Sequence, residues 1–356
     1  LCRRYVLELI KVDYKNNKGQ WALIIPISGL NLDKSIGEEL TIDRVTFISV
    51  SKLHRVRKRF NLPLRINEFI DKRPLNKEIF ESCKTVAIVS LGGKGCEKEL
   101  ELLEIVRKEL SFISSSQLGY CRRKNNACLS LSSETRIGQI NYMMLNLTAG
   151  DYMTTSTITG RFEELKVDCN WKKFQKSSFF FDFINLLNSQ KQISSAWQKN
   201  IEDAVSLAGK SQSCSELSLA FLYNMIAIET LLTESGDKFS EMLPNRVEAF
   251  IGWSIDWDNE DYRKKIASLY QKRCRFVHAG DTSNIQIDDL LFSDNLLLNV
   301  LHNILKHIDI FQSKKDLISF SKKIEAEQLL NIKSKIRPKT IRYLNIIYSE
   351  NDRKHT

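Results

Sequence analysis

The carboxy-terminal half of the chain carries a helical pattern of apolar residues. From about Phe180, apolar side chains recur at three- and four-residue spacing, which is typical of helices that bury one face. One segment, "SELSLAFLYNMIAIETLLTES", is apolar nearly all round and predicts a central, buried helix. Further helices are predicted in "LPNRVEAFIGW", "NEDYRKKIASLYQKRCRFVHAG" and "IDDLLFSDNLLLNVLHNILKHIDIF". Because the connections between them are short, we expect an antiparallel bundle over residues 181–312.

The first 180 residues follow a different pattern. Short runs of β-branched and aromatic residues alternate with turn-forming segments and predict strands in "QWALIIPI", "EELTID" and "RVTFISVS". A strand, a glycine-rich turn and a helix are expected in "KTVAIVSLGGKGCEKELELLEIVRKELSFI", and two more strands in "ACLSLSS" and "INYMMLNLT". The sequence therefore predicts an α+β fold. Its parts are a β-rich, mixed region at 1–180, a helical domain at 181–312 and a basic, part-helical extension at 313–356.

The charge balance favours one class of binding partner. Its 356 residues carry a formal net charge of +10, which suits a polyanionic partner such as nucleic acid, because lysine and arginine release counterions there. The cysteines are scattered without zinc-ligand spacing, which predicts reduced thiols, no bound metal and a cytoplasmic location. No apolar run is long enough to span a bilayer, so no membrane partner is expected.

Two segments in the first hundred residues carry possible binding chemistry. The run "SKLHRVRKRF" is the densest basic patch, with four candidate RNA contacts: Arg55, Arg57, Lys58 and Arg59. A solvated charged face is the simpler interpretation of this run. The glycines at 92–95 lack the spacing and the Ser or Thr of a phosphate loop. We therefore expect a tight βα turn there, with a nucleotide-dependent enzyme as the alternative.

The stretch "QKRCRFVHAGDT" places Arg273 and His278 five residues apart near a helix end. In a regular helix the two side chains point about 140° apart, so they converge either where the helix loosens near Gly280 or across a two-fold axis. Arginine matches phosphate oxygens with a charged donor fork, and histidine accepts and returns a proton near neutral pH. Together they suffice for metal-free RNA cleavage, in which the ribose 2′-OH attacks the adjacent phosphorus. The same spacing also fits a surface cation and a packed histidine, which periodicity alone favours.

A longer similarity surrounds this pair. The segment "LYQKRCRFVHAGD" resembles the Arg–His signature of HEPN domains, in particular the Apea-like subgroup, whose helix has roughly the pattern Tyr-x-x-Arg-Ser-x-x-Val-His-x-Gly. The matching positions are Tyr270, Arg273, Val277, His278 and Gly280. Upstream, "FLYNMIAIETLL", with Ile228 and Glu229, and "LPNRVEAFIG", with Arg246, resemble two further helices of the subgroup. The resemblance covers residues 192–311.

The resemblance implies a helical bundle that dimerises and places two Arg/His pairs in one cleft. Active members of the family are metal-independent endoribonucleases that need no cofactor, and many serve in antiphage defence or toxin systems. We therefore expect cleavage of tRNA or mRNA to a 2′,3′-cyclic phosphate and a 5′-OH, in defence by abortive infection. The partners implied are RNA, a second copy of the chain in a homodimer or higher homo-oligomer, and a phage-derived trigger or inhibitor.

The candidate catalytic residues are Arg273, which would clamp the phosphate, and His278, which would act as general base or acid. Glu229 is a carboxylate in an apolar helix and should be paired if buried, with Arg273 or Arg246 as its partner. Tyr270 is a supporting residue on the same helix.

Three neighbours of the pair are less specific. Cys274 stands where the family often has a polar Asn, Asp, His or Ser, although a thiol is nearly isosteric with serine and donates weakly. Lys272 and Arg275 are either contacts to the RNA backbone or solvated cations. The main alternative function is a catalytically silent HEPN scaffold that binds RNA or a protein partner.

Overall fold

The computed structural model describes residues 18–60, 83–131, 138–145, 152–159, 163–188, 193–251, 260–332 and 341–346. A region built on an antiparallel sheet comes first along the chain, and a group of helices follows it. The predicted α+β fold class is therefore confirmed.

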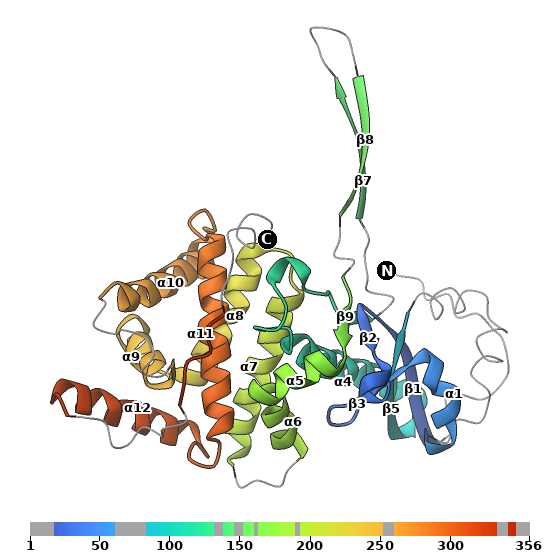
Figure 1. Ribbon diagram of the computed structural model, residues 1–356, viewed down its shortest axis with the longest axis horizontal. Coiled ribbons are helices and arrows are strands. Elements are labelled where there is room, and N and C mark those ends of the chain that lie inside the picture. The colour runs from blue at the N-terminus through green and yellow to red at the C-terminus, as the bar shows by residue number, and fades with distance from the viewer. Residues whose placement is uncertain are drawn as a thin grey trace.

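The described elements include strands and α-helices. The strands are β1 (Lys18–Ser28), β2 (Leu30–Leu32), β3 (Glu39–Thr41), β4 (Thr46–Ser49), β5 (Thr85–Lys94), β6 (Ser130–Leu131), β7 (Gly138–Leu145), β8 (Tyr152–Thr159) and β9 (Leu165–Val167). The α-helices are α1 (Val50–Val56), α4 (Gly95–Ser115), α5 (Cys169–Ser177), α6 (Phe180–Asn188), α7 (Ser195–Ser213), α8 (Leu217–Leu232), α9 (Phe239–Ile251), α10 (Glu260–Ala279), α11 (Ile287–Lys306) and α12 (Lys314–Leu329). Figure 1 shows the sheet region beside the helical bundle, with the β7–β8 hairpin extending away from both.

The main sheet has the strand order β3-β4-β5-β1-β6, and its neighbouring strands are antiparallel. Successive residues of β5 point to opposite faces, as strand geometry requires. Ala87 and Val89 join the main core, on the side of α4. Val86 and Ile88 join a smaller cluster with Leu53 of α1. Because both faces are covered there, residues 86–89 are all apolar and do not alternate with polar residues.

The glycine-rich segment differs from its prediction. β5 continues through Gly92 and Gly93, which pair with Gln20 and Gly19 of β1, and α4 begins at Gly95. The expected turn at these glycines is therefore wrong, because strand pairing with β1 extends to the start of the helix. A phosphate cradle needs such a backbone as an open loop, so the nucleotide-dependent alternative loses its support.

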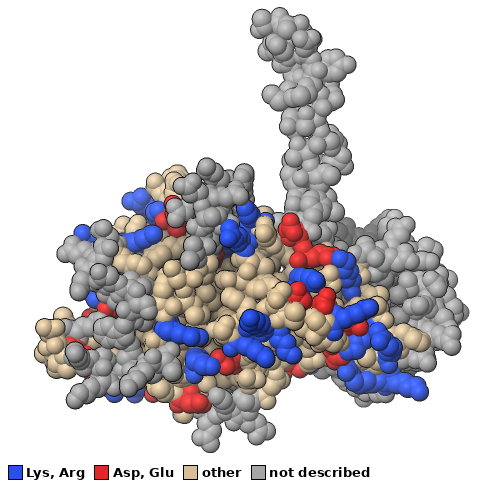
Figure 2. Space-filling model, viewed as in Figure 1, with Lys and Arg blue, Asp and Glu red and all other residues tan. Residues whose placement is uncertain are grey.

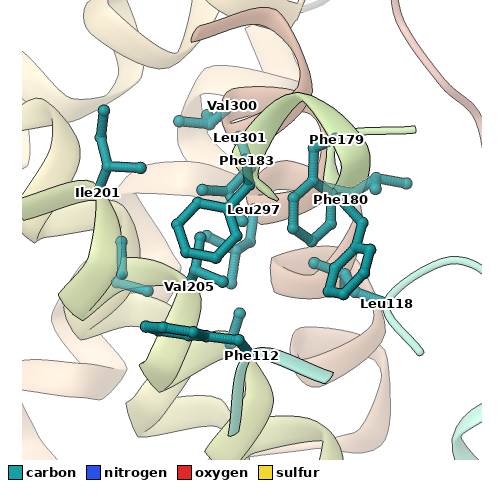
Figure 3. Close-up of a cluster of buried hydrophobic side chains, with 14 of the residues drawn as sticks. Phe112, Leu118, Phe179, Phe180, Phe183, Ile201, Val205, Leu297, Val300 and Leu301 are labelled. Atoms are coloured by element: carbon teal, nitrogen blue, oxygen red, sulfur yellow. The ribbon is translucent and has the colours of Figure 1, made fainter. Parts of the chain in front are cut away.

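One hydrophobic core joins the sheet region to the bundle. α4 packs against α7 so closely that a Cβ on Gly209 would lie 1.8 Å from the Ser111 carbonyl oxygen. Figure 3 shows large side chains of α4, α6, α7 and α11 meeting in one cluster. The three predicted ranges, 1–180, 181–312 and 313–356, all contribute residues to this connected core.

Helix α8 lies in the middle of the bundle, as its apolar sequence predicts. It contacts α7, α9, α10, α11 and α12, and it buries apolar residues such as Phe221, Met225 and Ile228, while a stripe that includes Ile226 is half-buried. Its last turn contains Glu229, a carboxylate that is only 7% exposed. The contact between α8 and α10 places this carboxylate beside the helix that carries the Arg–His pair.

The segment 341–346 lies against α11 and ties the basic extension to the bundle. Asn303 bonds both the carbonyl and the N–H of Arg342, at 2.9 and 3.2 Å. Asn299 does the same for Leu344, at 3.0 and 2.6 Å. Four residues of helix rise about 6 Å, which nearly matches two residues of extended chain. This spacing lets two asparagines one turn apart hold alternate residues of the segment.

Candidate functional site

The helix that carries the pair, α10, stays regular to its end. Gly280 adopts the left-handed conformation, with φ of 66°, and its N–H donates to the Phe276 carbonyl at 2.9 Å. The Asp281 N–H reaches the Arg275 carbonyl at 3.4 Å, which completes a glycine-terminated helix cap. The expected loosening near Gly280 does not occur, because this cap satisfies the last carbonyls without unwinding the helix. Arg273 and His278 therefore remain on different faces of one chain.

Arg273 points from α10 toward α8. Its Nη2 donates to the Glu229 Oε2 atom at 2.8 Å, and the two side chains are 19% and 9% exposed. The structure thus pairs Glu229 with Arg273. Burial raises the pKa of Glu229, and the positive charge of Arg273 opposes that shift.

This ion pair is incompletely satisfied. The Oε1 atom of Glu229 and the Nε atom of Arg273 are both buried and have no hydrogen-bond partner among the described residues. Only one guanidinium nitrogen is engaged with the carboxylate, whereas arginine has five N–H donors. Such a guanidinium is oriented by its carboxylate and keeps donors for a second anion, such as a phosphate.

Tyr270 and Cys274 flank the ion pair, one turn apart on α10. The ring of Tyr270 packs edge-on against Phe239, with ring centres 5.8 Å apart. Burial, helped by a hydrogen bond with Cys274, raises the pKa of Tyr270 to about 12. The phenol therefore stays protonated at neutral pH, and it supports the site as a neutral hydroxyl group.

Arg246 does not belong to this site, which corrects its assignment as a possible partner of Glu229. It donates to the two carboxylate oxygens of Asp237 at 2.6 and 2.9 Å and to the Leu232 carbonyl at 2.6 Å. These bonds lower the pKa of Asp237. Arg246 instead braces the connection between α8 and α9, because it binds the last carbonyl of α8 and the loop that follows.

The remaining α10 candidates separate into two kinds. His278 and Arg275 are exposed near the carboxyl end of the helix. Lys272 is partly buried, and its Nζ contacts the Asp289 carboxylate at 2.7 Å. The same carboxylate accepts the Gln286 N–H and caps the start of α11. Lys272 is therefore held by the protein, while Arg275 and His278 face solvent.

The basic run in the amino-terminal region is partly neutralised. Arg55 lies 3.4 Å from Glu38, and Arg59 lies 2.5 Å from Glu39, although both arginines remain more than half exposed. Lys58 is exposed, and the side chain of Arg57 lies outside the described residues. Figure 2 shows lysines and arginines in a band across one face of the molecule, with acidic side chains interspersed. These pairs favour the solvated-face interpretation over a dedicated RNA contact.

A polar depression next to α10 was not predicted from the sequence. It has a volume of about 350 Å³ and is lined by Ser268, Gln271, Lys272, Arg275, Asn284 and Gln286. Its helical members are spaced three, one and three residues apart, which puts them on one face. That spacing is a signal in the sequence, but the contribution of the loop before α11 is visible only in the fold.

Comparison with known proteins adds no information about this site. No family model matches the chain, no curated protein matches it, and no solved structure matches it. Within the described part of the chain, no helix is long and apolar enough to cross a membrane. Within the same part, no group of three or more His, Cys, Asp or Glu side chains is placed to hold a metal ion.

Proposed function

We propose that this protein is a metal-independent endoribonuclease in which Arg273 and His278 carry the reaction. The observation that supports this most is the state of Arg273: the guanidinium is oriented by buried Glu229 and bonds this carboxylate through Nη2 alone. It lies on the helix whose exposed end presents His278. A fixed cation and a solvent-facing imidazole suffice for metal-free phosphodiester cleavage at a ribose.

In the proposed reaction His278 removes the proton from the ribose 2′-OH. The 2′-oxygen forms a bond to the adjacent phosphorus, and the bond from phosphorus to the 5′-oxygen breaks. Arg273 stabilises the charge that builds on the phosphoryl oxygens, and an imidazolium returns a proton to the leaving 5′-oxygen. The products are a 2′,3′-cyclic phosphate and a 5′-OH. DNA lacks the nucleophile and is spared.

Two copies complete the site in this proposal. Because α10 stays regular, Arg273 and His278 of one chain point in different directions. Around a two-fold axis, the exposed ends of two α10 helices would bring both pairs into one cleft. The exposed end of α10 includes Val277, an apolar side chain that is 48% exposed and could be covered in such a dimer. The cellular role proposed with it is cytoplasmic defence by abortive infection, with tRNA or mRNA as substrate and a phage-derived trigger.

The test is RNA cleavage in EDTA by the wild type, Arg273→Ala and His278→Ala, with His54→Ala as a control because His54 is an exposed histidine on α1. We expect cyclic-phosphate ends from the wild type and the control. Both site variants should lose at least about a hundredfold in rate. Sedimentation reports the oligomeric state in the same samples. Equal cleavage by His278→Ala and the wild type would refute this assignment.

A catalytically silent scaffold is the second candidate function. Glu229 already compensates the charge of Arg273, and Cys274 replaces the polar neighbour that the family often has. This function predicts that RNA or a protein partner binds without cleavage, including in extracts of phage-infected cells that supply a trigger. Cleavage that depends on His278 would exclude it.

A further inference from the structure

The polar depression on the outer side of α10 has the composition of an anion-binding site. Six of the described residues line it, and each of these is polar or cationic. Three side-chain amides, one hydroxyl, one ammonium and one guanidinium group surround a space of about 350 Å³. This volume lies in the range of small-ligand sites, but the lining is mostly polar and offers little apolar surface for a drug-like or lipid ligand.

The depression shares a helix face with His278. Ser268, Gln271, Lys272 and Arg275 lie along one stripe of α10 because they are three or four residues apart. His278 follows Arg275 by three residues and continues this stripe. Arg273 lies on the other side of the helix, where it contacts α8.

The two cations of the depression are not equally available. Lys272 is bound to Asp289 at 2.7 Å and is mostly shielded. Arg275 is exposed, and its positive charge helps to lower the pKa of Asp281. Asp281 is also bonded to Ser283, through both the backbone and the hydroxyl. Arg275 is therefore the cation best placed to bind an incoming phosphate.

We infer that this depression binds the sugar–phosphate backbone of single-stranded RNA one or two nucleotides from the bond that is cut. The inference rests on the proposed function, since it takes RNA as the ligand. The guanidinium of Arg275 would bind a phosphate, and the amides of Gln271 and Asn284 would bond ribose hydroxyls or a second phosphate. Among the described residues, no aromatic side chain lines the depression, so the inferred contact is to the RNA backbone and does not depend on base stacking.

Binding of a labelled single-stranded RNA tests the inference. It is measured by fluorescence anisotropy in the His278→Ala background, so that cleavage does not interfere. Adding Arg275→Gln should weaken binding several-fold and make the slope of log affinity against log salt shallower by about 1. Lys323→Gln is the matched control, because it removes one exposed positive charge from α12, outside the depression. Gln271→Ala should weaken binding without changing the salt slope.

The outcomes separate this inference from the proposed function. Weaker binding by Arg275→Gln than by the Lys323→Gln control supports the depression, even if the wild type cleaves nothing and the nuclease proposal fails. Equal affinity and equal salt slope in these two variants overturn the inference that the depression binds RNA, even if His278→Ala shows that the nuclease proposal is correct. Failure of every variant to bind RNA overturns it as well.

Discussion

Two arginine–carboxylate pairs in the bundle differ in how completely they are satisfied. In the first, Arg123 donates to both oxygens of Asp294 at 2.6 and 2.7 Å and to Ser211 at 2.6 and 2.7 Å, and each partner of the ion pair is 2% exposed. In the second, Arg273 makes one bond to Glu229, and a buried polar atom on each side has no partner among the described residues. The first pair has every guanidinium nitrogen occupied, whereas the second uses only Nη2 of its guanidinium.

The difference indicates what each pair contributes. A fully bonded pair deep in the core fixes the arrangement of the elements that meet there. An ion pair with unsatisfied atoms at a partly exposed edge costs stability. Proteins often retain such polar groups at sites that bind a ligand or perform catalysis. The contrast supports Arg273 as a functional residue and Arg123 as a structural one.

Removing Arg123 should give the largest loss of stability. Arg123→Met leaves the Asp294 carboxylate buried without its counter-charge, so the free energy of unfolding should fall by about 3–5 kcal/mol. Denaturant unfolding followed by circular dichroism measures this loss. The double variant Arg123→Met/Asp294→Leu removes both charges and should recover part of it. A loss well under 1 kcal/mol in the single variant would contradict the structural role.

Removing Arg273 should separate activity from stability. Arg273→Met should lower the free energy of unfolding by less than about 2 kcal/mol, because the pair makes a single bond at a partly exposed edge. RNA cleavage should fall about a hundredfold or more, since the transition state loses its cation. Both quantities are measured on the same preparation.

Arg246→Met is the matched control for this experiment. It breaks the bonds to Asp237 and the Leu232 carbonyl, so it should cost about 1–3 kcal/mol of stability and leave cleavage per folded molecule unchanged. If Arg246→Met abolished cleavage in folded protein while Arg273→Met did not, the assignment of the two arginines would be reversed.

Much of this arrangement follows from the sequence because it depends on local periodicity. The apolar sequence around Ile228 predicts a buried α8, and a carboxylate such as Glu229 in that helix predicts a partner. The identity of the partner does not follow, because it depends on how the loop after Leu232 turns. In the structure that loop brings Asp237 to Arg246 and leaves Glu229 to Arg273.

Other features depend on contacts between segments far apart in the chain. The glycines at 92–93 are typical of a turn, but pairing with β1 extends the strand through them. Gly280 is typical of a helix end and predicts a loosened last turn, but a regular cap forms there and the helix does not unwind. The Asp289 partner of Lys272 comes from the next helix, and spacing along α10 gives no sign of it.

The two pairs near the end of α8 should also respond to pH in opposite directions. Burial raises the pKa of Glu229, so the folded state holds this proton more tightly than the unfolded state does, and stability from this group falls as pH rises through the raised pKa. Arg246 lowers the pKa of Asp237, so stability from this group is present above the unfolded pKa and is lost as pH falls.

Unfolding free energies measured through the range where carboxyl groups titrate check these signs. In the wild type, Glu229 makes the free energy of unfolding fall as pH rises, and Glu229→Gln should abolish this contribution. Asp237 makes the free energy of unfolding rise with pH over the more acidic part of the range, and Asp237→Asn should abolish this contribution. Matching pH profiles for the two variants would show that the pairs are electrostatically alike, and the contrast between them would be lost.

The smallest effect is expected from Cys274→Ser. Serine is nearly isosteric with cysteine and can keep the hydrogen bond to Tyr270, so stability should change by no more than about 0.5 kcal/mol. Cleavage should change by less than about threefold, because the charge that stabilises the transition state comes from Arg273 and the proton transfer from His278. The measurement is the initial rate on one RNA, with Cys274→Val as the variant that removes the hydrogen-bonding group. A large gain in cleavage on the change to serine would mean that the thiol restrains the site. The chain with Cys274 would then be closer to a silent scaffold than to an active nuclease, because its incompletely satisfied ion pair alone would not suffice for catalysis.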